Sequence, residues 1–144
     1  DLPPEEEGEL RDPMKAAGID TVRLVAPTTL DDRLPYVLEH ASGFFYYVSI
    51  TGITGTASPT LDSIEAAVKR LKKHTDLPMA VGFGIRTPEM VGKVSRVADA
   101  AVVGSAIVER VTANLDELGQ AKPNLVTDVM GFVRQLSDGV HSAS

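Results

Sequence analysis

Three glycine-containing turns are the parts of this sequence best suited to chemistry. Each follows a short apolar run, and they read Thr51-Gly52-Ile53-Thr54-Gly55, Gly82-Phe83-Gly84 and Gly104-Ser105. Glycine lets backbone N–H groups approach an anion closely, and a helix N-terminus adds unpaired N–H donors and a favourable dipole. Gly104-Ser105 opens a short helix-like stretch, and Gly84 lies one helix–strand unit earlier. We therefore expect these two turns to be neighbours that bind one phosphate.

The same glycines could be ordinary turn residues, because glycine often follows a strand. Their joint occurrence, with a short helix after the last one, favours a binding site. The sequence has no Walker motif, and Gly82-Phe83-Gly84 continues as Ile85-Arg86-Thr87, which does not fit the GxGxxG dinucleotide pattern. No Ser-His-Asp arrangement is recognisable. The three histidines are too widely separated to predict a metal site; they are His40, His74 and His141.

Composition narrows the classes of partner. The net charge of −6 argues against a nucleic-acid-binding or anionic-membrane-binding surface. The apolar runs are far shorter than the ~20 residues needed to span a bilayer. The chain has no cysteine, so disulfides and thiolate metal sites are excluded. No signal peptide is visible, and we expect a cytoplasmic protein with no nucleic-acid or membrane partner.

Four short runs rich in β-branched and aromatic residues predict strands. Their near-continuous hydrophobicity predicts a sheet covered on both faces. Within the second run, alternation sends one of Tyr46 and Tyr47 to each face, where the inward ring could fill the core or form a platform for an aromatic ligand. The predicted strands are Thr21–Ala26, Phe44–Ile50, Pro78–Phe83 and Ala100–Val103.

Helical patterns alternate with these strands, which predicts right-handed βαβ units and a parallel α/β sheet. Thr29, Thr60 and Thr87 are the expected N-caps, Pro13 predicts a kink or a break, and the tail from Asp138 onward is expected to fray. The predicted helices are Glu5–Ala17, Leu30–His40, Leu61–Lys73, Pro88 to about Val97, Ser105–Val111 and Asn124–Leu136.

Taken together, four motifs resemble those of the tryptophan synthase α subunit family, in the same order and with similar spacing. They are Asp1-Leu2-Pro3-Pro4-Glu5-Glu6, Tyr46-Tyr47-Val48-Ser49 leading into Gly52-Ile53-Thr54-Gly55, Gly82-Phe83-Gly84-Ile85 and Gly104-Ser105-Ala106-Ile107-Val108. The resemblance implies a (β/α)8 TIM barrel. Residues 1–144 would form the C-terminal half of that single domain, with about its last four strands and their helices. It also implies a carbon–carbon lyase of tryptophan biosynthesis that cleaves indole-3-glycerol phosphate to indole and glyceraldehyde 3-phosphate.

The resemblance assigns roles to individual residues. Gly55, Gly84, Gly104 and Ser105 would hold the phosphate; Tyr46, Phe83 and Val102 would line the indole pocket. Thr54 would lie in a loop that closes the site. Asp1, Pro3 and Glu5 match the segment that faces the β subunit of this family. No cofactor is implied for this chain, since pyridoxal phosphate belongs to that β subunit.

One departure from the family pattern limits what this chain can do. The family's catalytic Glu and Asp lie upstream of the matched region, and a whole barrel takes ~250 residues, so 144 residues supply roughly half. We therefore predict no catalytic residue and no lyase activity in the isolated chain. Two open sheet edges would attract pairing, and a homodimer that completes a barrel is one expectation. The alternatives are another phosphate-binding barrel, such as indole-glycerol-phosphate synthase, and a non-catalytic phosphate-binding half-barrel module.

Overall fold

A parallel four-stranded sheet organises the chain. The structure is a computed structural model and describes residues 2–48, 60–82 and 84–142. Its strands lie in the order β1-β2-β3-β4, and all three neighbouring pairs are parallel. Their bounds are β1 Arg23–Val25, β2 Phe45–Val48, β3 Met79–Gly82 and β4 Ala100–Ala101. The predicted strand positions and the parallel α/β class are confirmed.

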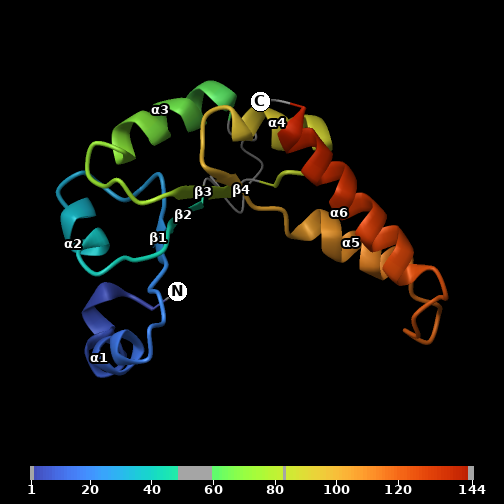
Figure 1. Ribbon diagram of the computed structural model, residues 1–144, viewed down its shortest axis with the longest axis horizontal. Coiled ribbons are helices and arrows are strands. Elements are labelled where there is room, and N and C mark those ends of the chain that lie inside the picture. Colours follow the sequence, from blue (N-terminus) through green and yellow to red (C-terminus); the bar gives the residue numbers. More distant parts are fainter. Residues whose placement is uncertain (1, 49–59, 83, 143–144) are drawn as a thin grey trace.

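The helices form an outer layer around this sheet. Going along the chain, α1, α2, α3, α4 and α6 follow one another in an arc, and α5 lies beside α6 (Figure 1). The bounds are 3-10 helix η1 Pro4–Glu6, α1 Gly8–Ala16, α2 Leu34–Leu38, α3 Leu61–Leu71, α4 Pro88–Ser95, α5 Ser105–Ala113 and α6 Leu125–His141. In the part of the chain that is described, no helix is long and apolar enough to cross a membrane.

The hydrophobic core lies between the helices and one face of the sheet. Phe45 and Tyr47 of β2 point into it and are 0% and 5% exposed, so alternation along this strand is as predicted. The prediction that both faces are covered is confirmed for β3, whose four residues are all buried, but is wrong for the edge strand β1. Leu24 shares its register position with Tyr46 on the other face and is 39% exposed. A continuous apolar strand sequence indicates that burial of both faces is favourable, but it does not say which residues cover them.

Two of the three predicted caps are confirmed. The side chains of Thr60 and Thr87 accept hydrogen bonds from the backbone N–H groups of Ser63 and Met90, at 3.2 and 3.3 Å. The third is wrong, because α2 begins at Leu34 rather than Leu30. Thr29 instead accepts from the N–H of Ala26 at 3.1 Å and closes a turn.

Two helices contain a proline, one in its first turn and one in its interior. Pro35 has no N–H to donate one turn back, so it is suited to the first turn of α2 and not to its interior. Pro13 lies inside α1, which continues through it to Ala16, so a break there is not observed. The expected Glu5–Ala17 helix is instead divided at Glu7, between η1 and α1.

The C-terminal helix is longer than predicted. Helix α6 extends to His141, so residues 138–141 do not fray as expected. Gly139 explains the extension, because its Cα lies against the backbone of Pro88 at the start of α4. This contact holds the last turn of α6 on α4, and nothing in the local sequence of α6 specifies it.

Candidate functional site

The carboxyl ends of β3 and β4 place two of the glycine turns at the same edge of the sheet. Ala80 pairs with Ala100 and Val81 with Ala101. The N–H of Val102 then donates to the carbonyl of Val81 at 2.9 Å, so the chain stays in register as far as Val102. The segments that carry Gly84 and Gly104 therefore leave neighbouring strands on the same side, as the sequence predicts.

Gly84 has a backbone conformation that suits glycine. Its φ is +68°, in the left-handed region that residues with a side chain rarely adopt. A methyl group added there would meet no atom within 4 Å, so the space beside Gly84 is open. Backbone at this position can approach a bound group without steric hindrance.

Gly104 and Ser105 form the N-terminus of α5. Gly104 is the N-cap, and its carbonyl accepts from the N–H groups of Ile107 and Val108 at 2.9 and 3.2 Å. The N–H groups of the first helical turn have no intrahelical carbonyl to pair with. Both residues are exposed, and a methyl group on Gly104 would meet no atom within 4 Å. This helix end can accept an anion through backbone N–H groups and the Ser105 hydroxyl.

An ion pair connects the two turns. Arg86, two residues after Gly84, pairs with Glu109 of α5, and both side chains are about half exposed. Sequence analysis did not identify this pair, and a lone arginine in a turn gives no signal for it. Because Glu109 pairs with the guanidinium, an anion at this end of the sheet would be bound mainly through backbone N–H groups.

The face of the sheet beside these turns carries an aromatic side chain. Tyr46 of β2 is half-buried, and its ring lies across Gly82 of β3. Gly82 makes room for Tyr46, because any side chain on residue 82 would overlap that phenol. Val102, which is 37% exposed, continues β4 at the same end of the sheet.

Several predicted site residues lie outside the described part of the chain. They are Thr54, Gly55, Phe83 and Asp1. Of the predicted set, the structure places Tyr46, Gly84, Val102, Gly104 and Ser105 after or along neighbouring strands at one end of the sheet.

The segment expected to face a partner is at the surface. Pro3 and Glu5 are exposed, and the Glu5 carboxylate accepts from Arg33 Nη2 at 2.6 Å. The pKa of Glu5 is lowered, first by its own backbone N–H and then by Arg33. The Glu5 carboxylate is therefore charged and already pairs with Arg33 of the same chain.

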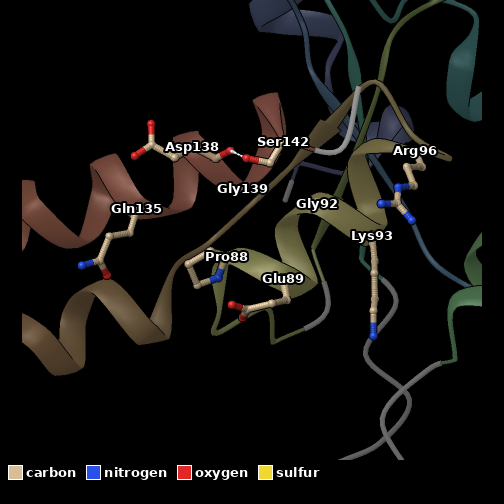
Figure 2. Close-up of a pocket in the computed structure, with 9 residues that line it drawn as sticks. All are labelled: Pro88, Glu89, Gly92, Lys93, Arg96, Gln135, Asp138, Gly139 and Ser142. Carbon is tan, nitrogen blue, oxygen red and sulfur yellow. Dashed lines mark hydrogen bonds between the residues drawn. The ribbon is translucent and has the colours of Figure 1, made fainter.

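A groove of about 460 Å³ runs along the contact between α4 and α6, and its charged side chains diverge into solvent (Figure 2). Figure 2 also shows the Ser142 hydroxyl, which donates a hydrogen bond to the carbonyl of Asp138 at 2.8 Å. Among the residues that are described, no group of three or more His, Cys, Asp or Glu side chains could hold a metal ion.

Comparison with known proteins identifies the family. The model of the tryptophan synthase alpha chain family matches residues 1–140. The chain belongs to this family. Solved tryptophan synthase alpha structures show the same fold, so the sheet described above corresponds to half of their TIM barrel. The resemblance seen in the glycine motifs is thereby confirmed, and the alternative barrel families are set aside.

Individual solved structures are similar to almost the whole chain. The subunit alpha of Legionella pneumophila str. Paris has 29% sequence identity and a TM-score of 0.80, and the match covers 99% of this chain and 50% of that chain. Tryptophan synthase from M. tuberculosis in its aminoacrylate-bound form has 26% identity and a TM-score of 0.77, with coverages of 97% and 48%. A protein from Aquifex aeolicus VF5 has 32% identity and a TM-score of 0.75, with coverages of 96% and 48%. This chain spans about half the length of these relatives.

Proposed function

We propose that this chain supplies the phosphate-binding and indole-binding half of a tryptophan synthase α-type lyase, which cleaves indole-3-glycerol phosphate to indole and glyceraldehyde 3-phosphate. The observation that carries the proposal is the open N-terminus of α5 at Gly104-Ser105, beside the left-handed Gly84 turn. A phosphate group there would accept hydrogen bonds from backbone N–H groups and the Ser105 hydroxyl. TIM-barrel enzymes commonly hold phosphate at such a short extra helix.

The indole end of the substrate would lie on the same side of the sheet. Tyr46 and Val102 offer apolar surface there, and both are partly exposed. In this proposal Phe83 adds to the ring wall, Gly55 adds to the phosphate site, and Thr54 belongs to the closing loop. Binding at two ends would fix the substrate's orientation before any bond is broken.

We propose that the groups for proton transfer are not among the residues that the structure describes, 2–48, 60–82 and 84–142. Glu109 is paired with Arg86. Asp99 lies just before β4, at the amino end of the strands, where its carboxylate accepts from the N–H of Met79 at 2.8 Å. General acid–base catalysis is worth about 10²–10⁴-fold, so the isolated chain should release no measurable indole. Indole formation by this chain alone would contradict this part of the proposal.

The partners follow from the family. We propose that Pro3, Glu5 and the adjoining Asp1 face a β subunit, and that pyridoxal phosphate belongs to that subunit and not to this chain. A cytoplasmic location and a role in tryptophan biosynthesis complete the proposal. Pro3 and Glu5 are both exposed at the surface, which supports this assignment.

Titration with inorganic phosphate and glycerol 3-phosphate, followed by NMR, tests the site. We expect the amide signals of Gly84, Gly104 and Ser105 to shift. Gly104→Val should abolish the shifts while far-UV circular dichroism stays unchanged, because its φ of −112° is accessible to valine and an added Cβ would meet no atom within 4 Å. The matched control is Gly131→Val on α6, where an added Cβ would also meet no atom within 4 Å. Unchanged binding in Gly104→Val would refute the phosphate site.

A further inference from the structure

We propose that Arg86 is an additional ligand for the phosphate group, and that Glu109 competes with the phosphate for the Arg86 guanidinium. This role rests on the phosphate site proposed above, at Gly84, Gly104 and Ser105. It adds an electrostatic control to that site, because one side chain then exchanges between an internal anion and a bound one.

Charged side chains are scarce in the three glycine-containing stretches of the sequence. Residues 49–60, 83–87 and 102–109 contain only two of them, Arg86 and Glu109. Arg86 is thus the one cation that these stretches offer to a phosphate, and Glu109 is their one acid. A bound phosphate and Glu109 are therefore rivals for the same positive charge.

Arg86 and Glu109 bind each other in the structure. Arg86 Nη2 donates to Glu109 Oε2, and both side chains are more than half exposed. An ion pair so accessible to solvent contributes little to stability, so its partners can exchange readily. The next cation of α5 is Arg110, whose Cζ lies 4.6 Å from the centre of the Phe132 ring on α6. Because Arg110 is engaged with α6, Arg86 is the cation that can serve the site.

The ion pair lies about one helical turn from the phosphate-binding end of α5. Glu109 is four residues after Ser105, the first residue of this helix. Residues with this spacing share a helix face, and their Cβ atoms are about 5–6 Å apart. The long side chain of Arg86 can cover this distance by changing rotamer. A phosphate at the N-terminus of α5 is therefore within reach of the guanidinium that Glu109 holds.

The backbone that carries Arg86 is anchored on both sides. Ile85 precedes it and is 2% exposed, in the hydrophobic core. Thr87 follows it and caps α4 by accepting from the N–H of Met90 at 3.3 Å. The exchange of partners therefore requires movement of the Arg86 side chain, while the turn around it stays in place.

A phosphate dianion is a better partner for Arg86 than a carboxylate is. The planar guanidinium can bind two phosphate oxygens at once, and a phosphate monoester carries almost two negative charges at neutral pH. With phosphate bound, Arg86 adds to the backbone N–H groups of the site, and Glu109 is left to solvent. Because the ion pair must first be broken, Glu109 lowers the affinity of the site for phosphate.

NMR titration with glycerol 3-phosphate tests the exchange directly and needs no variant. We expect the Arg86 Nε–H signal and the Glu109 carboxyl signal to shift together with the amide signals of Gly84 and Ser105. Amide shifts without a shift of the Arg86 signal would overturn the exchange and leave the proposed phosphate site intact. If no amide signal shifted, the phosphate site and the exchange would both be refuted.

Substitutions at the two positions measure the competition. Glu109→Gln should tighten glycerol 3-phosphate binding about two- to fivefold at low salt, the factor expected for release of an exposed ion pair. Arg86→Gln should weaken binding by a similar factor. In the Arg86→Gln background, Glu109→Gln should change the affinity little, because no guanidinium remains to compete for. Equal tightening in both backgrounds would show that Glu109 only repels the phosphate, and would overturn the competition.

Glu65→Gln is the matched control for the loss of one negative charge. Glu65 forms an exposed ion pair with Lys69 on α3 at 2.6 Å, so the substitution removes the same kind of contact at another helix. We expect unchanged affinity for glycerol 3-phosphate, and far-UV circular dichroism checks that each variant is folded. Tightening by Glu65→Gln as large as that by Glu109→Gln would assign the effect to net charge and overturn the role of Glu109.

Discussion

The phenol of Tyr46 lies directly over the Cα of Gly82 on the adjacent strand, so that a methyl group on residue 82 would be 2.7 Å from the ring carbon Cζ and closer still to the hydroxyl. These two residues occupy diagonal positions on β2 and β3, since Tyr46 pairs with Ala80 and Val48 with Gly82. The absence of a side chain at Gly82 therefore sets the orientation of the Tyr46 ring beside the candidate site.

Gly82→Ala should displace Tyr46 and lower the free energy of unfolding. Overpacking of this kind costs about 1–3 kcal/mol. Urea denaturation measures the loss. In the Tyr46→Ala background the same substitution should cost much less, giving a coupling of about 0.5–3 kcal/mol in a double-mutant cycle. Gly8→Ala, which meets no atom within 4 Å, is the control. Additive effects of the two substitutions would show that the ring does not restrict residue 82.

Gly139→Ala should separate the end of α6 from α4. The added methyl group would overlap the carbonyl oxygen of Pro88 and lie 2.9 Å from its carbon, and backbone cannot rotate away as a side chain can. We expect a loss of about 1–3 kcal/mol in thermal or urea denaturation.

Gly131→Ala provides the matched control for this contact. It lies on the same helix and its methyl group would meet no atom within 4 Å. Replacing glycine with alanine inside a helix should then stabilise by about 0.5–1 kcal/mol. If both substitutions changed stability equally, contact with Pro88 would not be the reason for glycine at residue 139.

Glu7→Gln should destabilise the chain strongly. It leaves the Arg23 guanidinium buried without its counter-charge, and the Nε of Arg23 has no hydrogen-bond partner among the described residues. Removing one partner of a buried pair costs about 3–5 kcal/mol. Glu65→Gln, in the exposed pair with Lys69 at 2.6 Å, should cost only about 0.3–0.5 kcal/mol. Comparable losses in the two variants would contradict the burial of the Glu7 pair.

Asp99 should make stability depend on pH. The pKa of its carboxyl is lowered, first by the hydrogen bond from Lys72 and further by the backbone N–H of Met79, while partial burial opposes the shift. Because the folded pKa lies below the unfolded pKa of ~3.9, the stabilisation is complete above that value and is lost as pH falls through the folded pKa.

Comparison with Asp99→Asn measures this contribution. The side chains of Asp99 and Lys72 are 45% and 32% exposed, so solvent screening limits the difference to about 0.5–1 kcal/mol at pH 7. Urea denaturation from pH 7 to pH 3 should show a constant difference down to about pH 5 and a shrinking one below. A difference that grew with acidification would have the wrong sign for a lowered pKa.

The sequence by itself determined the features that depend on neighbouring residues. Thr60 and Thr87 cap their helices through N–H groups three residues away, and glycine follows β3 and β4 at the left-handed Gly84 and at the start of α5. The alternation of apolar runs with helical patterns indicated the parallel order, and the glycine motifs indicated the family. These signals act over a few residues or recur as a pattern, so they can be read along the chain.

Only the tertiary structure decided which distant residues meet. Tyr46 and Gly82, Gly139 and Pro88, and Glu7 and Arg23 are pairs joined across strands and helices, and no local pattern specifies their contacts. The same reason explains the failure to predict the end of α6 and the open sheet face. The apolar side chains of Leu24 and Val102 favour burial. Only the arrangement of the helices shows that this chain does not cover them.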